Sequence, residues 1–251
     1  MNYLPAFSRF IATILTSFCI AANAQTTSGF SVATGSLYMG DPTSATSPSS
    51  VLYEPVVSKY QFDNFAVKLT LAHQAISPQG DWTTDAYPFH ELETSTGGAT
   101  FALTYRLPQA AIPGWIVAVT AKQHASTEYQ KAQFASPNFH ALQFDFRRTV
   151  EAWTVFSRMG YERAHALDGE RAVSRAYSSV GSSYQINRRA NIEVSMDYRR
   201  SAASIAAPEA EANTNLSVEI GKGLHCQAYL SKGLSSGDRS LDLGVILNAR
   251  F

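Results

Sequence analysis

The sequence is poor in cysteine and in charge. Of its two cysteines, Cys19 lies in a predicted leader and only Cys226 follows it, which excludes a disulfide framework and a multi-cysteine metal site. Charged residues make up 16% of the 251 residues, with 20 basic and 20 acidic side chains, and the lack of a basic excess gives no indication of a nucleic-acid partner. No glycine-rich phosphate loop occurs, so we expect no bound cofactor.

Apolar and aromatic residues are abundant instead. Hydrophobic residues make up 45% of the chain and aromatic residues 12%, led by 14 Phe and 12 Tyr. An apolar fraction of this size excludes an ordinary disordered chain. Because aromatic side chains are enriched in strands, the composition favours an all-β fold.

The first residues have the features of an export signal. Arg9 precedes an apolar run that is too short to span a bilayer, and Ala-Asn-Ala at 22–24 supplies a small-x-small cleavage pattern. We therefore predict a signal peptide over 1–24 and one outer-membrane barrel domain over 25–251. The latter contains no run of 18 apolar residues, so it would have to cross a membrane as the strands of a closed barrel.

Apolar and polar residues then alternate along most of the chain, as in strands with one apolar and one polar face. The alternation is clearest in 192–199 (IEVSMDYR) and in 241–251 (LDLGVILNARF), where only Ile246 interrupts it. Most segments have about the 9–11 residues of a tilted membrane strand. About twelve can be drawn, near 29–39, 50–60, 64–75, 97–106, 114–124, 138–148, 151–162, 172–187, 189–200, 212–222, 225–233 and 239–251.

The connections between these segments alternate between short and long. Short ones are predicted at 61–63, 107–113, 149–150, 188 and 223–224, and long ones at 40–49, 76–96, 125–137, 163–171 and 201–211. Outer-membrane barrels have this rhythm, with short periplasmic turns and longer extracellular loops. We therefore predict a transmembrane antiparallel up-and-down β-barrel of about twelve strands. Ten or fourteen strands are the alternatives, because 25–60 and 172–187 are weakly patterned.

Aromatic residues fall at the ends of the predicted strands. The expected periplasmic ends carry Tyr60, Trp115, Trp153 and Phe251, and the outer ends carry Tyr161 and Tyr198. This placement predicts two aromatic girdles at the membrane interfaces.

The end of the chain resembles the C-terminal signal by which Gram-negative outer-membrane β-barrel proteins are recognised for membrane insertion. The chain ends on Phe251, and apolar Val245, Leu247 and Ala249 stand at alternate positions before it. The resemblance implies insertion by the barrel-assembly machinery and contact with outer-membrane lipid. More loosely, 51–82 resembles the early strands of small proteobacterial transporter barrels, including those linked to meta-pathway degradation of phenolic compounds. This second resemblance implies a transporter and names no solute.

If the apolar face meets lipid, the other face lines the lumen. Charges of both signs stand on it, and we expect them to select solutes in a barrel wider than one that side chains fill and narrower than an aqueous porin. The alternative is that they pair across the lumen and close it. The aromatic loop 76–96 is either a constriction or an ordinary surface loop. The candidate pore-lining residues are Lys68, Arg106, Lys122, Asp145, Arg147, Arg158, Glu193, Asp197, Arg199 and Glu219, with Glu162 and Arg250 on the same face.

Passive or facilitated diffusion of a small solute is the preferred function, and it needs no catalytic residue. A lipid-modifying outer-membrane enzyme and a non-conducting structural or adhesion barrel are the alternatives. His90, beside Asp85 and Glu91, and His165, near Asp168, lie in predicted outer loops, but no serine stands in a nucleophile motif. We therefore expect neither a catalytic site nor a metal site.

Overall fold

The computed structural model describes residues 28–40, 50–76, 98–108, 112–126, 138–165, 173–201, 209–235 and 241–251. The predicted leader, the loop that follows residue 76, and the acid-flanked His90 lie outside these ranges, as does Asp168. Within the described ranges, no helix is long and apolar enough to cross a membrane.

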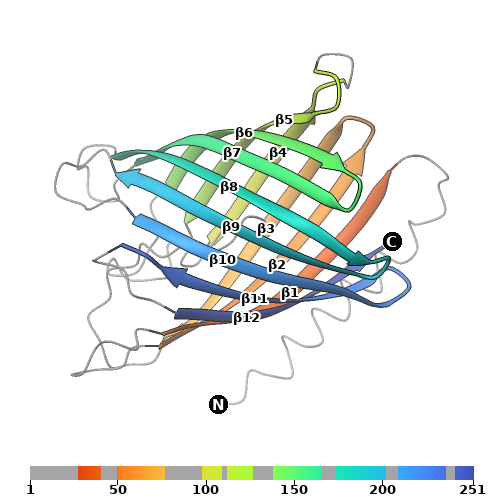
Figure 1. Ribbon diagram of the computed structural model, residues 1–251. Coiled ribbons are helices and arrows are strands. Elements are labelled where there is room, and N and C mark those ends of the chain that lie inside the picture. Colours follow the sequence, from red (N-terminus) through yellow and green to blue (C-terminus); the bar gives the residue numbers. More distant parts are fainter. Residues whose placement is uncertain are drawn as a thin grey trace.

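Twelve antiparallel strands form one closed barrel (Figure 1). Each strand pairs with its neighbours in the sequence, and β1 closes the barrel by pairing with β12. This confirms the predicted up-and-down barrel of twelve strands. The strands are β1 (Gly29–Gly40), β2 (Ser50–Phe62), β3 (Phe65–Ile76), β4 (Gly98–Arg106), β5 (Ile116–Ser126), β6 (Asn138–Val150), β7 (Trp153–His165), β8 (Val173–Asn187), β9 (Ala190–Ser201), β10 (Glu209–Gly221), β11 (Leu224–Gly233) and β12 (Leu241–Arg250).

The short connections all lie at one end of the barrel, on the right in Figure 1. Two-residue turns join β2 to β3, β6 to β7, β8 to β9 and β10 to β11. Asp63, Glu151 and Gly223 have positive φ angles of 48°, 53° and 71° in three of these turns, which is the left-handed conformation that such tight hairpins need. The described ends of the chain meet here too, because the Phe251 amide donates to the Phe30 carbonyl at 2.8 Å. We call this end the short-turn end and the opposite one the long-loop end.

Several predicted long connections are shorter in the structure than in the sequence analysis, and 201–211 differs most. The segment 201–211 was expected to be a loop, but β10 begins at Glu209 and Ala210 already pairs with Tyr198 of β9. Alanine and glutamate are weak strand formers, and pairing with β9 overrides this local preference. No strand limit differs from its predicted position by more than three residues.

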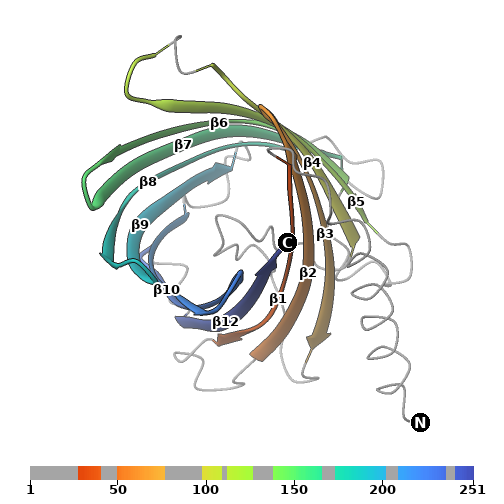
Figure 2. The same cartoon turned by 90° about the vertical axis from the view of Figure 1, so that its right-hand side faces the viewer.

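The outer surface of the barrel is a belt of apolar side chains. On β9, Val194, Met196 and Tyr198 point outward and are 49%, 54% and 45% exposed, while Ser195 between them faces inward and is 7% exposed. The same alternation runs around the barrel, whose strands Figure 2 shows from the short-turn end. Contact between a closed apolar belt of this kind and water is unfavourable, and the belt matches the hydrocarbon layer of a membrane.

Aromatic rings gather on this belt near the short-turn end. Trp153 lies against Tyr184 at 4.8 Å between ring centroids. On the other side of the barrel the contacts are Phe30–Phe251 at 6.2 Å, Tyr60–Phe62 at 5.9 Å, Phe62–Phe65 at 5.6 Å and Phe65–Tyr105 at 4.9 Å. Amphipathic rings at one level are typical of the interface between lipid and water.

Candidate functional site

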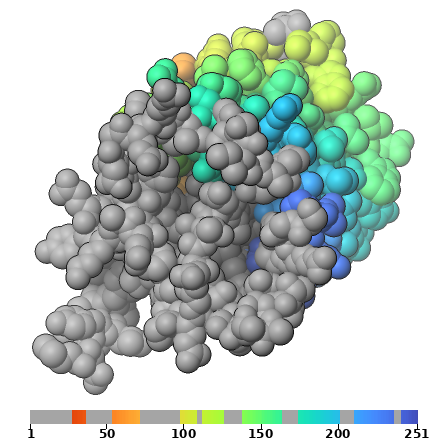
Figure 3. All heavy atoms as spheres, turned by 90° about the vertical axis from the view of Figure 1, so that its left-hand side faces the viewer, coloured from red at the N-terminus to blue at the C-terminus, as the bar shows by residue number. Residues whose placement is uncertain are grey.

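The described strands border two adjoining cavities inside the barrel. The smaller cavity has a volume of about 250 Å³ and lies mainly against β2 to β7. The larger cavity has a volume of about 490 Å³ and lies mainly against β6, β7 and β9 to β12. Both are bordered by Asp145, Arg158, Gln227, Ile246 and Asn248, so they are neighbouring parts of one lumen. Figure 3 views the molecule from the long-loop end, with the described atoms running from yellow and green at the top to blue at the lower right.

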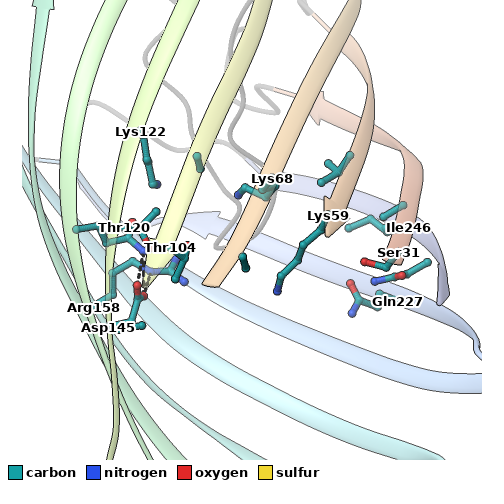
Figure 4. A pocket seen from close by; sticks show the side chains of 17 residues that line it. Ser31, Lys59, Lys68, Thr104, Thr120, Lys122, Asp145, Arg158, Gln227 and Ile246 are labelled. Carbon is teal, nitrogen blue, oxygen red and sulfur yellow. Dashed lines mark hydrogen bonds and ion pairs between the residues drawn. The ribbon is translucent and has the colours of Figure 1, made fainter. Parts of the chain in front are cut away.

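Three lysines stand on one wall of the smaller cavity, and we call them the lysine row. Lys59 of β2 is the register partner of Lys68 of β3. Lys68 is paired in turn with Ala102 of β4, and Ala102 with Lys122 of β5. The three side chains therefore stand on one line across four neighbouring strands, and Figure 4 shows them reaching into the cavity.

A hydrogen-bond network fixes the next part of the wall. The Asp145 carboxylate accepts from Arg158 Nε at 2.8 Å and from Gln143 Nε2 at 2.9 and 2.8 Å (Figure 4). The Tyr177 hydroxyl donates to Gln143 Oε1 at 3.1 Å, and Lys122 Nζ lies 5.8 Å from the centre of the Tyr177 ring. The network joins β5, β6, β7 and β8, and it neutralises the one carboxylate that borders the smaller cavity among the described residues.

Two lumen-facing tyrosines lie flat against the wall because a glycine stands opposite each. Tyr177 is the register partner of Gly160, and Tyr229 is the partner of Gly244. A Cβ atom at either glycine would overlap the facing ring. A larger residue at these positions would have to push the ring toward the lumen, so the two glycines keep the passage wide.

The larger cavity has a polar wall that is rich in amides and hydroxyls. Asn191, Ser195, Asn213, Asn215 and Ser217 border it from β9 and β10, and Gln227 and Asn248 from β11 and β12. Its charged neighbours are Arg147, Arg158, Arg250, Asp145 and Glu193. Neutral hydrogen-bonding groups together with charged side chains make a surface that water and polar solutes can wet.

The structure brings six of the ten candidate pore-lining residues to these cavities. They are Lys68, Lys122, Asp145, Arg147, Arg158 and Glu193, and Arg250 joins them. Four candidates share the inward face and border neither cavity. Of these, Asp197 accepts a hydrogen bond from Asn213 Nδ2 at 2.7 Å, and the other three are Arg106, Arg199 and Glu219 near the strand ends.

Sequence reasoning missed Lys59, which borders the smaller cavity. In 51–60 both sets of alternate residues contain valine, so the lumen side could not be told from valine alone. Tyr60 and Phe62, which share the other set, were the signal that could have placed Lys59 inside, because both are exposed on the apolar belt. With Lys59 included, four cationic side chains and one carboxylate border the smaller cavity among the described residues.

One of the described histidines, His124, is buried. His124 is 1% exposed, its Nδ1 shares a hydrogen bond of 3.0 Å with the Thr100 hydroxyl, and its ring stacks on Phe139 at 5.0 Å. This packing is typical of a structural histidine. Among the described residues, no group of three or more His, Cys, Asp or Glu side chains is arranged to hold a metal ion.

Comparison with known proteins places the fold among outer-membrane channels. No family model matches the chain, and no curated protein matches it. An outer-membrane channel from Pseudomonas putida F1 is similar in structure, with a TM-score of 0.65 and 12% identity over 91% of this chain and 97% of that one. The NanC porin has a TM-score of 0.60 and 8% identity over 87% and 98%. A KdgM porin in complex with disordered oligogalacturonate has a TM-score of 0.58 and 10% identity, over 88% of this chain and 99% of that one. The fold is therefore that of outer-membrane barrels.

Proposed function

We propose that this protein lies in the outer membrane and lets small solutes diffuse passively through its lumen. The observation that carries the proposal is the polar lumen inside an apolar belt, with adjoining cavities of about 250 and 490 Å³. A barrel of about eight strands is just wide enough for side chains to fill its interior, and twelve strands enclose a wider one. The channels and porins with the same fold support this function. Diffusion needs a lined passage and no covalent step.

The same proposal assigns an orientation and a route of assembly. The short-turn end would face the periplasm, since outer-membrane barrels keep their short turns there. The signal peptide at 1–24 would direct export. The alternating apolar residues of β12, which end on Phe251, would be read by the barrel-assembly machinery. Val245, Leu247 and Phe251 lie on the apolar belt and are 50%, 45% and 43% exposed. These residues of the C-terminal insertion signal would therefore also contact lipid.

A pair of neighbouring residues on β4 allows a matched test. Thr104 borders the smaller cavity, and Leu103 beside it is 42% exposed on the apolar belt. Each would be changed to cysteine in a Cys226→Ser background, which removes the remaining thiol. The proteins would be inserted into planar lipid bilayers and treated with a charged thiosulfonate reagent while current is recorded. Thr104→Cys changes a residue whose hydroxyl bonds Thr120 at 2.9 Å, so unfolding of each variant is measured in parallel.

We expect stepwise currents from both variants, and we expect the reagent to reduce the current of Thr104→Cys and not that of Leu103→Cys. The physical reason is that a label at residue 104 narrows the passage, whereas a label at residue 103 projects toward lipid. A correctly folded barrel without current would refute diffusion and favour the non-conducting structural or adhesion barrel. A current that both labels leave unchanged would mean that ions pass outside this lumen.

A further inference from the structure

We propose that the outer surface of β7, β8 and β9 near the long-loop end binds the phosphate of an outer-leaflet lipid through Arg163 and Arg200. This inference rests on the membrane location and orientation in the proposed function, because they put the long-loop end at the outer leaflet. It is carried by the outward position of the two arginines, by the strand register around them and by the distribution of the acidic residues.

The two arginines stand on the outside of the barrel, at the edge of the apolar belt. Arg163 of β7 and Arg200 of β9 are both exposed. Each lies two residues beyond an outward tyrosine of its own strand, Tyr161 at 55% exposed and Tyr198 at 45%. Alternation therefore directs both arginine side chains outward. Because tyrosine rings are typical of the headgroup level of a membrane, the guanidinium groups beyond them lie among the lipid headgroups.

The strand register sets the two arginines on either side of β8. Arg163 is the partner of Ser174, and Ala176 is the partner of Arg200. The three strands lie side by side in Figure 1. With neighbouring strands about 4.8 Å apart and a rise of about 3.3 Å per residue, the two arginine Cα atoms are about 12 Å apart. Since the residues between them on β8 are small, both long side chains can reach one group above that strand.

The carboxylates of this part of the barrel are on the other side of the wall. Within the described strands β6 to β9, all of them alternate with the exposed apolar residues and so face inward; they are Asp145, Glu162, Glu193 and Asp197. Asp145 and Glu193 border the cavities, and Asp197 accepts from Asn213 Nδ2. The charged side chains on the outer face of these four strands are therefore basic.

A phosphate matches this pair of side chains. A guanidinium group presents planar donors that fit two phosphate oxygens at once, and it stays charged at physiological pH. The position of the pair favours a lipid as the source of the phosphate, because the apolar belt continues on both strands directly below it. Met159 of β7 and Met196 of β9 are 49% and 54% exposed there, where they would contact the acyl chains of the same lipid.

The test is the binding of lipid A to the purified full-length barrel in an uncharged detergent, measured by native mass spectrometry. A dephosphorylated lipid A with the same acyl chains is the second probe. Arg163→Gln, Arg200→Gln and the double variant change the site. Arg148→Gln is the matched control, because Arg148 is exposed on the outer face of β6 at the short-turn end, where its guanidinium lies 5.9 Å from the centre of the Trp115 ring.

We expect the wild type and Arg148→Gln to bind lipid A with equal affinity. One basic side chain near an anionic membrane surface changes affinity about fivefold, so each single variant should lose about this factor and the double variant about thirtyfold. The wild type should bind the dephosphorylated probe as weakly as the double variant binds lipid A. Equal binding of the two probes, or single variants that bind lipid A like the wild type, overturns the phosphate site. A wild type that covers this face with a second copy of itself and binds no lipid does so too.

Single-channel recording distinguishes the lipid site from the proposed function. The double variant changes no residue that borders the cavities, so its conductance should equal that of the wild type. A barrel that conducts and binds no lipid A overturns the lipid site while diffusion stands. A folded barrel that binds lipid A through the two arginines and does not conduct overturns diffusion and supports the site.

Discussion

Replacing Lys59 with glutamate should make the barrel more stable. In the wild type, Lys59 and Lys68 are directly opposed on neighbouring strands and repel each other. Lys59→Glu turns this repulsive pair into an attractive one at the same position. A gain in stability is the behaviour expected of a residue that is not retained for the stability of the fold.

The size of the stabilisation follows from the position of the pair. A cross-strand charge pair contributes roughly 0.2–1 kcal/mol, so exchanging repulsion for attraction spans about 0.4–2 kcal/mol. Lys59 is exposed to the cavity, where water screens the interaction, and we therefore expect the lower part of this range, about 0.4–1 kcal/mol. Lys59→Gln removes the repulsion and adds no attraction, so it should give about half of the gain.

Equilibrium unfolding in urea, followed by tryptophan fluorescence in lipid vesicles, measures these differences. The gain of Lys59→Glu over wild type should shrink in 1 M salt, where the Debye length is about 3 Å. Lys222→Glu, in an exposed turn, should leave the unfolding midpoint unchanged. If Lys59→Glu folds and is less stable than Lys59→Gln at low salt, the two lysines do not interact as described.

Three other changes test separate parts of the structure. Gly160→Val should displace the ring of Tyr177 and so lower both the single-channel conductance and the stability of the barrel. The control is Gly29→Val, which should change neither quantity because the space around Gly29 is open. Arg158→Met leaves Asp145 without its ion-pair partner and should cost roughly 1–3 kcal/mol in urea unfolding. Asp145→Asn in the same background should recover part of that loss, and a double mutant no more stable than the single one would contradict the pairing. Phe251→Ala should reduce the amount of folded protein in the outer membrane of expressing cells, measured by heat-modifiable migration on gels, and an unchanged amount would argue against a C-terminal insertion signal.

The strands were predictable because alternation is a local property of the sequence. In 192–199 and 241–251 every outward position is apolar, and the structure places these residues on the apolar belt. The connections were predictable for a related reason, since short turns and long loops leave gaps of different length between the patterned segments. The start of β10 was placed too late because residues 209–211 are weak strand formers that become ordered through pairing with β9.

The lumen was less predictable because its properties depend on register. Alternation assigned Lys68 and Lys122 to the inner face, but only the pairing of β2 with β3 brings Lys59 next to Lys68. The flat packing of Tyr177 over Gly160 likewise depends on the alignment of β7 with β8. A sequence with no net charge therefore gave no indication that one wall of the lumen would be basic.

The most direct test of the central claim is single-channel recording of the wild-type barrel in a planar bilayer with a gradient of potassium chloride. Folding would be established beforehand by β-sheet circular dichroism and by heat-modifiable migration. We expect discrete current steps. A folded, inserted barrel that gives no steps would contradict the claim that solutes pass through this lumen.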